Sequence, residues 1–349
     1  MRSTTHTLLL LSCLIIPGCK QSVRNKTPLP ESTKKLVIIE NGGTRLGILR
    51  EVGGRIVFFQ KDGSKNLLES DPDLWNEPDS QRPVITPFTE WKAYNGHNVW
   101  VGPQSQWWTQ QSANLTRKNA KAVWPPDPYI ILSDYDIVNQ TESSITVKSP
   151  KSPVSGVQLV KEMSIDKKGK VTFTVTATNI RDEDVSWDLW LNTRVNGYAR
   201  CYVKCEPFLP NRTKSEVNAT NDSVDYTYNN GYFTFHPAMP RNGKEQAFTK
   251  AFLFPDKPFI AAFDKGYLFL LRFHDFHIGQ IHNEQALVEL YNLTTPNGKN
   301  TLLELEHHGP YLTLKSGESM TLSETWEAIP YKGGDNDAEH IAFIKKMVE

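Results

Sequence analysis

The chain has 349 residues, of which 38% are apolar and 22% are charged. This composition excludes a disordered or collagen-like protein. Lys plus Arg and Asp plus Glu each number 39, so no excess of basic residues indicates nucleic-acid binding, and we expect no nucleic-acid partner. The 9 Trp, 12 Tyr and 16 Phe favour a β-rich fold or a site where aromatic rings stack.

The N-terminus has the pattern of an export signal. Arg2 precedes the apolar segment 8–16, which is too short to cross a bilayer core of ~30 Å as a helix. The segment ends at Pro17-Gly18-Cys19 and resembles the bacterial lipobox, in which a small residue precedes a cysteine that becomes lipidated. We therefore expect a signal peptide over 1–19, an acylated Cys19 and a polar tether over 20–35; an ordinary secretion signal is the alternative.

The rest of the chain has the periodicity of short strands. Apolar runs and alternating apolar and polar residues, separated by Gly, Asp and Asn, predict strands. They span 36–40, 45–49, 53–59, 144–148, 157–165, 170–179, 187–195, 232–235, 247–254, 267–273, 287–293, 301–307 and 319–328. Helical spacing predicts a C-terminal helix within 331–349, and Pro83 precedes a possible short helix over 84–90. The pattern predicts one large antiparallel β-sandwich over 36–330.

Two cysteines remain in the predicted domain, Cys201 and Cys205. The expected compartment permits a disulfide. Segment 200–204 has the pattern of a strand, and four strand residues span ~13 Å, whereas a disulfide needs Cα atoms within ~7 Å. We expect a disulfide only if this segment bends.

Motifs at both ends resemble the galactose mutarotase-like (aldose 1-epimerase-like) fold. The Gly53-Gly54-Arg55-Ile56 turn resembles its opening, and the Glu-bearing segment 303–310, followed by 314–319 and Trp326, resembles its closing strands. Segments 96–104, 124–128 and 188–190 resemble an uncharacterised family of bacterial secreted proteins and lipoproteins assigned to this fold. The resemblance covers 36–330 and implies an all-β supersandwich.

The resemblance also implies acid–base residues. Mutarotases of this fold open a sugar ring with a Glu and a His, one donating and one accepting a proton. Glu306 matches the closing-strand Glu and would be the base, with Glu304 on the same strand face as the alternative. His97, in a loop with Trp100, resembles the sugar-contacting His. The second His is missing, and His308 is its best substitute. A surface carboxylate and a structural His remain the alternatives.

Five of the nine tryptophans lie between residues 91 and 124, among several Gln and Asn residues. Indole rings stack on sugar C–H faces, so this segment is a candidate glycan-binding loop; an aromatic core that covers one end of the sandwich is the alternative. The candidate substrate-binding residues are Trp100, Gln104, Trp107, Trp124, Asp127, Trp190, Asn192 and Arg194.

Three functions remain open at this point: an enzyme acting on a carbohydrate, a non-catalytic glycan-binding lipoprotein and a structural envelope protein. His274, His277 and His282 are close in sequence, but 274 and 277 alternate across a strand, so we expect no metal and no cofactor. We expect a monomer, anchored by lipid in the bacterial cell envelope on the periplasmic or outer-membrane side, with a carbohydrate as its ligand.

Overall fold

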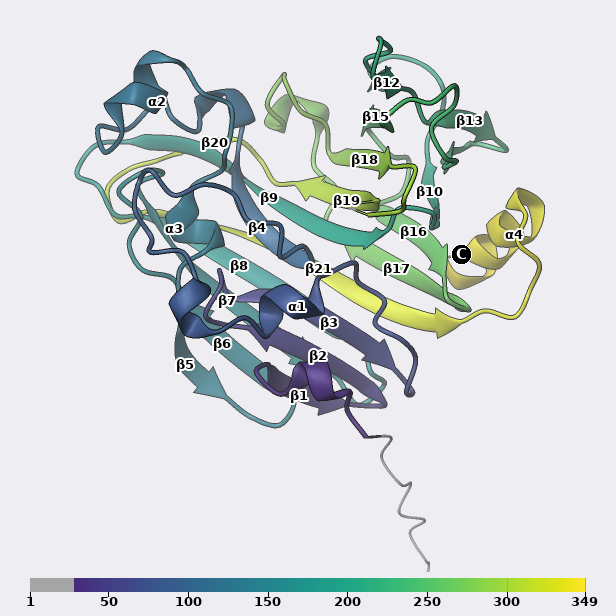
Figure 1. Cartoon of the computed structure of the whole chain (residues 1–349), viewed down its shortest axis with the longest axis horizontal. Helices are drawn as coiled ribbons and strands as arrows, with labels where there is room; N and C mark the ends of the chain where they lie inside the picture. Colours follow the sequence, from purple (N-terminus) through teal and green to yellow (C-terminus); the bar gives the residue numbers. More distant parts are fainter. Residues whose placement is uncertain (1–27, 300, 349) are drawn as a thin grey trace, which may run out of the picture.

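The structure is a computed structural model that describes residues 28–299 and 301–348 (Figure 1). The predicted signal peptide, Cys19 and the first part of the predicted tether lie outside the described residues. The described part of the tether contains a short 3₁₀ helix, η1 (Glu31–Thr33). Within the described residues, no helix has the length and apolar character needed to cross a membrane.

Two large sheets form the body of the protein, with 42% of residues in strands and 12% in helices. Neighbouring strands pair antiparallel, except that β12 runs parallel to β15. The first sheet has the order β1 (Val37–Asn41), β2 (Thr44–Leu49), β3 (Arg55–Lys61), β4 (His97–Gly102), β9 (Val185–Asn196), β19 (Leu302–His308), β18 (Val288–Thr294), β15 (Gln246–Leu253) and β11 (Arg212–Lys214), with β12 (Asn221–Asp222) on β15 and β20 (Leu312–Leu314) on β9.

The second sheet packs against one face of the first. Its order is β13 (Asp225–Asn229), β14 (Tyr232–His236), β10 (Arg200–Lys204), β16 (Phe259–Asp264), β17 (Tyr267–Phe273), β21 (Ser319–Pro330), β8 (Val171–Asn179), β7 (Val157–Ile165), β6 (Ser144–Lys148) and β5 (Asp136–Gln140). The side chains of β7 and β8 alternate between the core and the outside, as expected for a sheet with one covered face. This arrangement confirms the predicted all-β sandwich.

Helices are short apart from the last one. They are α1 (Pro72–Trp75), η2 (Asp79–Gln81), η3 (Gln104–Gln106), α2 (Leu115–Asn119), α3 (Pro128–Ile131), η4 (Ile278–Gln280) and α4 (Asp337–Val348). Helix α4 confirms the predicted C-terminal helix. The prediction of a short helix over 84–90 is wrong, because this segment is irregular and contains a turn at 87–88. There the Thr89 hydroxyl bonds the Val84 carbonyl and accepts from the Thr86 amide, which replaces helical bonding.

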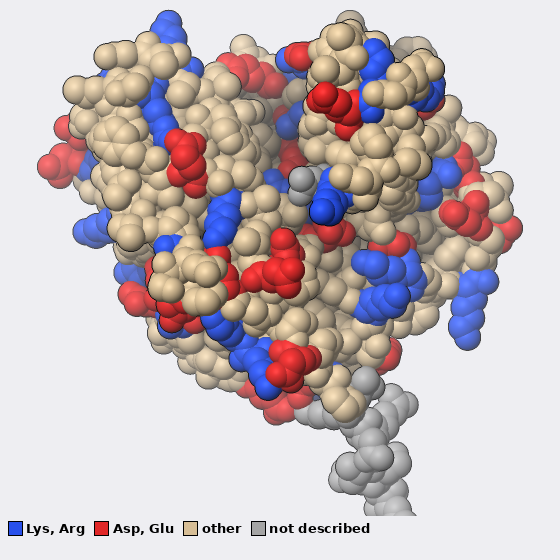
Figure 2. Space-filling view, viewed as in Figure 1, with Lys and Arg blue, Asp and Glu red and all other residues tan. Residues whose placement is uncertain are grey.

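Strands β9 and β19 differ from β7 and β8 because nearly all of their residues are buried, on both faces. One face packs on the second sheet. The other face lies beneath two lobes, one containing α2 and one containing β11 to β13 (Figure 1). Figure 2 shows a hollow between the lobes, with acidic and basic side chains inside it.

Strand β10 is extended, as predicted, and Cys201 and Cys205 are buried free thiols. Burial raises the pKa of each thiol to about 12.

Candidate functional site

Strand register decides which side chains share the face beneath the lobes. On β19, His307 contacts Phe273 and Glu324 of the second sheet, so it points between the sheets. Glu304, Glu306 and His308 therefore point the opposite way. Across the pairing, Glu304 lies beside Arg194, and Glu306 lies beside Asn192 and Glu289. The charged cluster consists of Arg194, Lys250, Glu289, Glu304, Glu306 and His308.

Glu306 lies at the centre of this cluster and is fully buried. Its Oε2 accepts a hydrogen bond from the Trp190 indole at 2.9 Å and one from the Lys250 ammonium at 3.2 Å. Lys250 also lies 2.6 Å from Oε2 of Glu289. Burial, reinforced by Glu304 and Glu289, raises the pKa of Glu306 well above its usual range, although Lys250 opposes the shift. Burial lowers the pKa of Lys250, but the carboxylates outweigh burial and raise it.

Glu304 has the opposite electrostatic environment. Its Oε1 accepts from Nε of Arg194 at 2.7 Å and lies 2.5 Å from Nη2. Burial alone would raise the pKa of Glu304, but the charges of Arg194 and Lys250 together with hydrogen bonding outweigh burial and lower it. The pKa values of two neighbouring carboxylates on one strand face are therefore shifted in opposite directions, because one is paired with a guanidinium and the other is more deeply buried.

A tryptophan cluster adjoins the charges. It consists of Trp91, Trp100, Trp107, Trp124 and Trp190. The Trp100 ring lies 4.8 Å from Trp190 and 5.6 Å from Trp107, and Trp91 lies 5.1 Å from Trp124. Trp100 and Trp107 are buried, whereas Trp124 is 45% exposed and Trp91 is half-buried. The cluster therefore combines an aromatic core with a surface on which a ligand could stack.

Arginine and lysine link the two clusters. The Arg194 guanidinium lies 5.3 Å from the centre of the Trp91 ring and 5.5 Å from that of Trp100. The Lys250 ammonium lies 4.9 Å from the Trp190 ring centre. Cations at these distances are attracted by the ring faces. The charged cluster and the tryptophan cluster are therefore in direct contact.

His97 does not lie with Glu306, which corrects the sequence-based interpretation. The segment expected as a loop is the central strand β4, whose residues are all buried, so no alternation of polar and apolar residues revealed it. His97 points between the sheets, with Nδ1 2.9 Å from the Thr193 hydroxyl. Its ring packs on Phe173 and Trp326 at 4.4 and 5.0 Å. Burial lowers the pKa of His97 to about 4.

Two predicted substrate-binding residues have structural contacts instead. Asp127 is buried and caps α3 by accepting from the Tyr129 amide at 2.9 Å. Gln104 donates to the Val123 carbonyl at 2.8 Å. Asn192 belongs to the buried face beside Glu306, and its side-chain O and N have no hydrogen-bond partner among the described residues.

The sequence interpretation missed Lys250, Glu289 and Asp188. Glu289 lies between apolar residues within the predicted strand 287–293, and a charge inside a buried run was the available signal. No feature of the sequence indicated Lys250 as a site residue, because strand alternation alone predicts that its side chain faces solvent. Glu289, Glu306 and His308 bring one potential ligand atom each within 4.8 Å of the others. His274 and His277 are exposed, and His277 caps η4.

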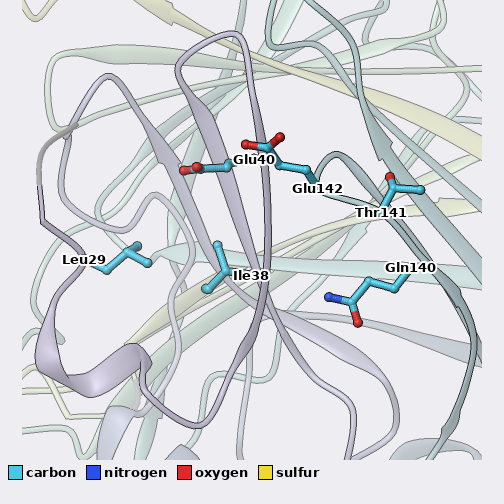
Figure 3. Close-up of a pocket in the computed structure, with 6 residues that line it drawn as sticks. All are labelled: Leu29, Ile38, Glu40, Gln140, Thr141 and Glu142. Carbon is cyan, nitrogen blue, oxygen red and sulfur yellow. The ribbon is translucent and has the colours of Figure 1, made fainter. Parts of the chain in front are cut away.

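A separate cavity of about 560 Å³ lies between β1 and the β5–β6 hairpin (Figure 3). It contains no aromatic side chain and none of the predicted site residues. It is lined by Leu29, Ile38, Glu40, Gln140, Thr141 and Glu142. The cavity is therefore distinct from the charged cluster.

Comparison with solved structures supports the fold. A galactose mutarotase-like protein from Lactobacillus casei superposes with a TM-score of 0.51 at 12% identity, covering 84% of this chain and 99% of that one. A galactose mutarotase related enzyme from Lactobacillus acidophilus gives 0.50 at 10% identity, covering 86% and 100%. The fold is therefore galactose mutarotase-like, as predicted.

Sequence comparison assigns the family. None of the curated proteins matches this chain. Residues 35–329 match the family described as a domain of unknown function, DUF4380. This match spans both sheets and every residue of the charged and tryptophan clusters. The chain therefore belongs to the DUF4380 family.

Proposed function

We propose that this protein binds a carbohydrate in the hollow, with the sugar stacked on the tryptophan cluster and its hydroxyl groups bonded to the charged cluster. The observation that carries the proposal is that the two clusters are in contact, through Arg194 and Lys250 against the rings of Trp91, Trp100 and Trp190. Trp124 and Trp91 offer ring surface, while Arg194 and Glu304 offer a donor and an acceptor. The mutarotase-related names of the structural neighbours agree with a sugar ligand.

A glycan array probed with residues 20–349 tests the proposal. We expect selective binding of a subset of glycans. Trp124→Ala should weaken binding by about tenfold, or ~1.4 kcal/mol, the scale of an aromatic contact. Phe88→Ala is the matched control, because Phe88 is also exposed but lies outside the tryptophan cluster. Absence of selective binding, or equal binding by the Trp124 variant, would contradict the proposal.

A second candidate is proton transfer at the bound sugar. It is favoured by the position of Glu306 and His308, which share a strand face and bring polar atoms within 4.8 Å. Ring opening needs one group to protonate the ring oxygen and another to take the anomeric proton, and Glu306 is the proposed base. The full burial of both residues instead favours binding without turnover, so the two candidates need a direct test.

Anomer exchange followed by NMR separates these candidates. If the protein is an epimerase-type enzyme, it should accelerate the interconversion of a sugar that it binds. Glu306→Gln should then abolish the acceleration while binding stays within about tenfold. Glu162→Gln, an exposed carboxylate of the second sheet, should keep full activity. A wild-type protein that binds the sugar without accelerating exchange is a non-catalytic glycan-binding protein.

We also propose that the protein is anchored in the cell envelope by a lipid on Cys19. The support is the sequence 16–19 and the polar segment that follows it. Acyl chains contribute roughly 0.8 kcal/mol for each buried methylene, so several chains give a firm anchor.

A further inference from the structure

The charged cluster contains buried ligand atoms without partners. Glu289, Glu306 and His308 are at most 2% exposed, and one potential ligand atom of each lies within 4.8 Å of the others. Oε1 of Glu306 and Nε2 of His308 have no hydrogen-bond partner among the described residues. Because buried polar atoms are nearly always paired, this arrangement indicates an additional bound group.

Lys250 occupies only one oxygen of each carboxylate. Its ammonium lies 2.6 Å from Oε2 of Glu289 and 3.2 Å from Oε2 of Glu306. The Oε1 atom of Glu289 accepts from the Ala286 amide at 3.1 Å and lies 3.6 Å from Nε2 of His308. Its second lone pair and Oε1 of Glu306 therefore remain available beside the imidazole. Glu289 and Glu306 share this single lysine, since Arg194 is paired with Glu304.

The other side of the His308 ring faces an amide and a carboxylate. Nδ1 lies 2.9 Å from the Gln285 amide nitrogen and 3.6 Å from Oδ1 of Asp188. Oε1 of Gln285 has no hydrogen-bond partner among the described residues, so with this amide turned by 180° Nδ1 would donate to it and Nε2 would be free to bind an ion. Asp188 is fully buried, and neither carboxylate oxygen has a hydrogen-bond partner among the described residues. Histidine ligands usually direct their second nitrogen to a carboxylate or carbonyl, which orients the ring.

We propose that Glu289, Glu306 and His308 bind a divalent transition-metal ion, with Asp188 orienting His308 and Lys250 balancing the carboxylates. One imidazole nitrogen with two carboxylate oxygens suits Zn²⁺ or Mn²⁺ better than Mg²⁺ or Ca²⁺, which prefer all-oxygen sites. The metal site extends the proposed sugar binding and is tested separately from it, because its three residues belong to the charged cluster. A bound ion would occupy the Glu306 and His308 atoms that proton transfer requires, so metal content also bears on that candidate.

Calorimetric titration of the chelator-treated protein, residues 20–349, with ZnCl₂ and MnCl₂ tests the site. We expect one ion per chain for at least one of these metals. Glu289→Gln and His308→Gln should each weaken binding by about tenfold or more, the scale seen on removing metal-site groups. Lys250→Gln should strengthen binding, because it removes a competing positive charge from two of the ligands. This gain cannot result from misfolding.

The control is the double variant His274→Gln and His277→Gln, which removes exposed imidazoles outside the cluster. It should bind like the wild type. Three results would overturn the proposal. They are absence of stoichiometric binding of either metal, loss of binding only in this control, and unchanged or weaker binding by Lys250→Gln. Sugar binding measured in chelator is a separate result, so failure of the metal site and failure of the proposed function are distinguishable.

Discussion

Neighbouring residues of β19 have different surroundings because side chains alternate across a strand. His307 packs between the sheets at 4.6 Å from the Phe273 ring, whereas His308 lies on the opposite face, 4.9 Å from the Trp190 ring. Burial lowers the pKa of His307, although its hydrogen bond with Glu324 opposes the shift. The candidate site residues of this strand are therefore its even-numbered ones, Glu304, Glu306 and His308, which share the face opposite His307.

His97 predicts a specific pH dependence of stability. Its pKa is about 4 in the folded protein against an ordinary 6.5, so the folded state binds this proton less readily than the unfolded state. The stability that the neutral ring contributes is complete above pH 6.5 and is lost as the pH falls toward 4. Between these limits, wild type should lose about 3 kcal/mol more of its unfolding free energy than His97→Gln.

Urea unfolding at pH 7, 5.5 and 4 measures this difference. His274→Gln, at an exposed histidine, should keep the wild-type slope. Equal slopes for wild type and His97→Gln would show that His97 is not held neutral by burial. The offset between variants at neutral pH, where His97→Gln also loses the bond to Thr193, does not bear on the slope.

At the scale of elements, α4 covers part of the outer face of the second sheet. Ile341 and Ile344 are buried in an apolar cluster with Tyr202 of β10, Phe263 of β16 and Leu268 of β17. The His340 ring stacks on Phe263 at 3.9 Å. The periodic apolar face of the helix therefore has a matching apolar face on the sheet, which fixes where it docks.

We predict that Ile344→Ala destabilises the protein by ~2–5 kcal/mol, because the side chain is fully buried and its removal leaves a cavity. Lys345→Ala, at the neighbouring exposed position, should change stability by less than ~0.5 kcal/mol. Urea unfolding of both variants checks the pair. If Ile344→Ala costs no more than Lys345→Ala, the docking of α4 contributes little to stability.

At the scale of the whole molecule, the two lobes turn one face of the first sheet into the floor of a hollow (Figure 2). The lobes come from distant parts of the chain, since one contains α2 and the other contains β11 to β13 (Figure 1). A ligand in the hollow would contact both lobes. Any lipid on Cys19 would tether the molecule through the N-terminal segment that precedes β1.

The lipobox predicts how the protein distributes in cells. With Cys19 intact, we expect incorporation of labelled fatty acid and recovery in the membrane fraction. Cys19→Ala should remain unlabelled and be released into the soluble fraction with the same circular dichroism spectrum, because the sandwich does not need the lipid to fold. Wild-type protein that takes up no fatty acid would contradict the lipoprotein proposal, and Cys201→Ala is the control for a cysteine that should carry no lipid.

Local patterns in the sequence determined most of the sandwich. Strand alternation in β7 and β8, the Gly53-Gly54 turn and the apolar spacing of α4 each express a local rule of backbone geometry. Alternation also placed Glu304, Glu306 and His308 on one face. The same rules could not identify β4, because a strand buried on both faces has no polar side to reveal its period.

Tertiary structure alone decided the composition of the site. Lys250 reaches Glu289 and Glu306 only because β15 pairs with β18, although β16 and β17 of the other sheet separate β15 from β18 in the chain. His97 was excluded by the strand on which it lies, which directs it between the sheets. The sequence determined which side chains share a strand face; long-range strand pairing decided which faces meet, because that pairing depends on packing across the whole sandwich.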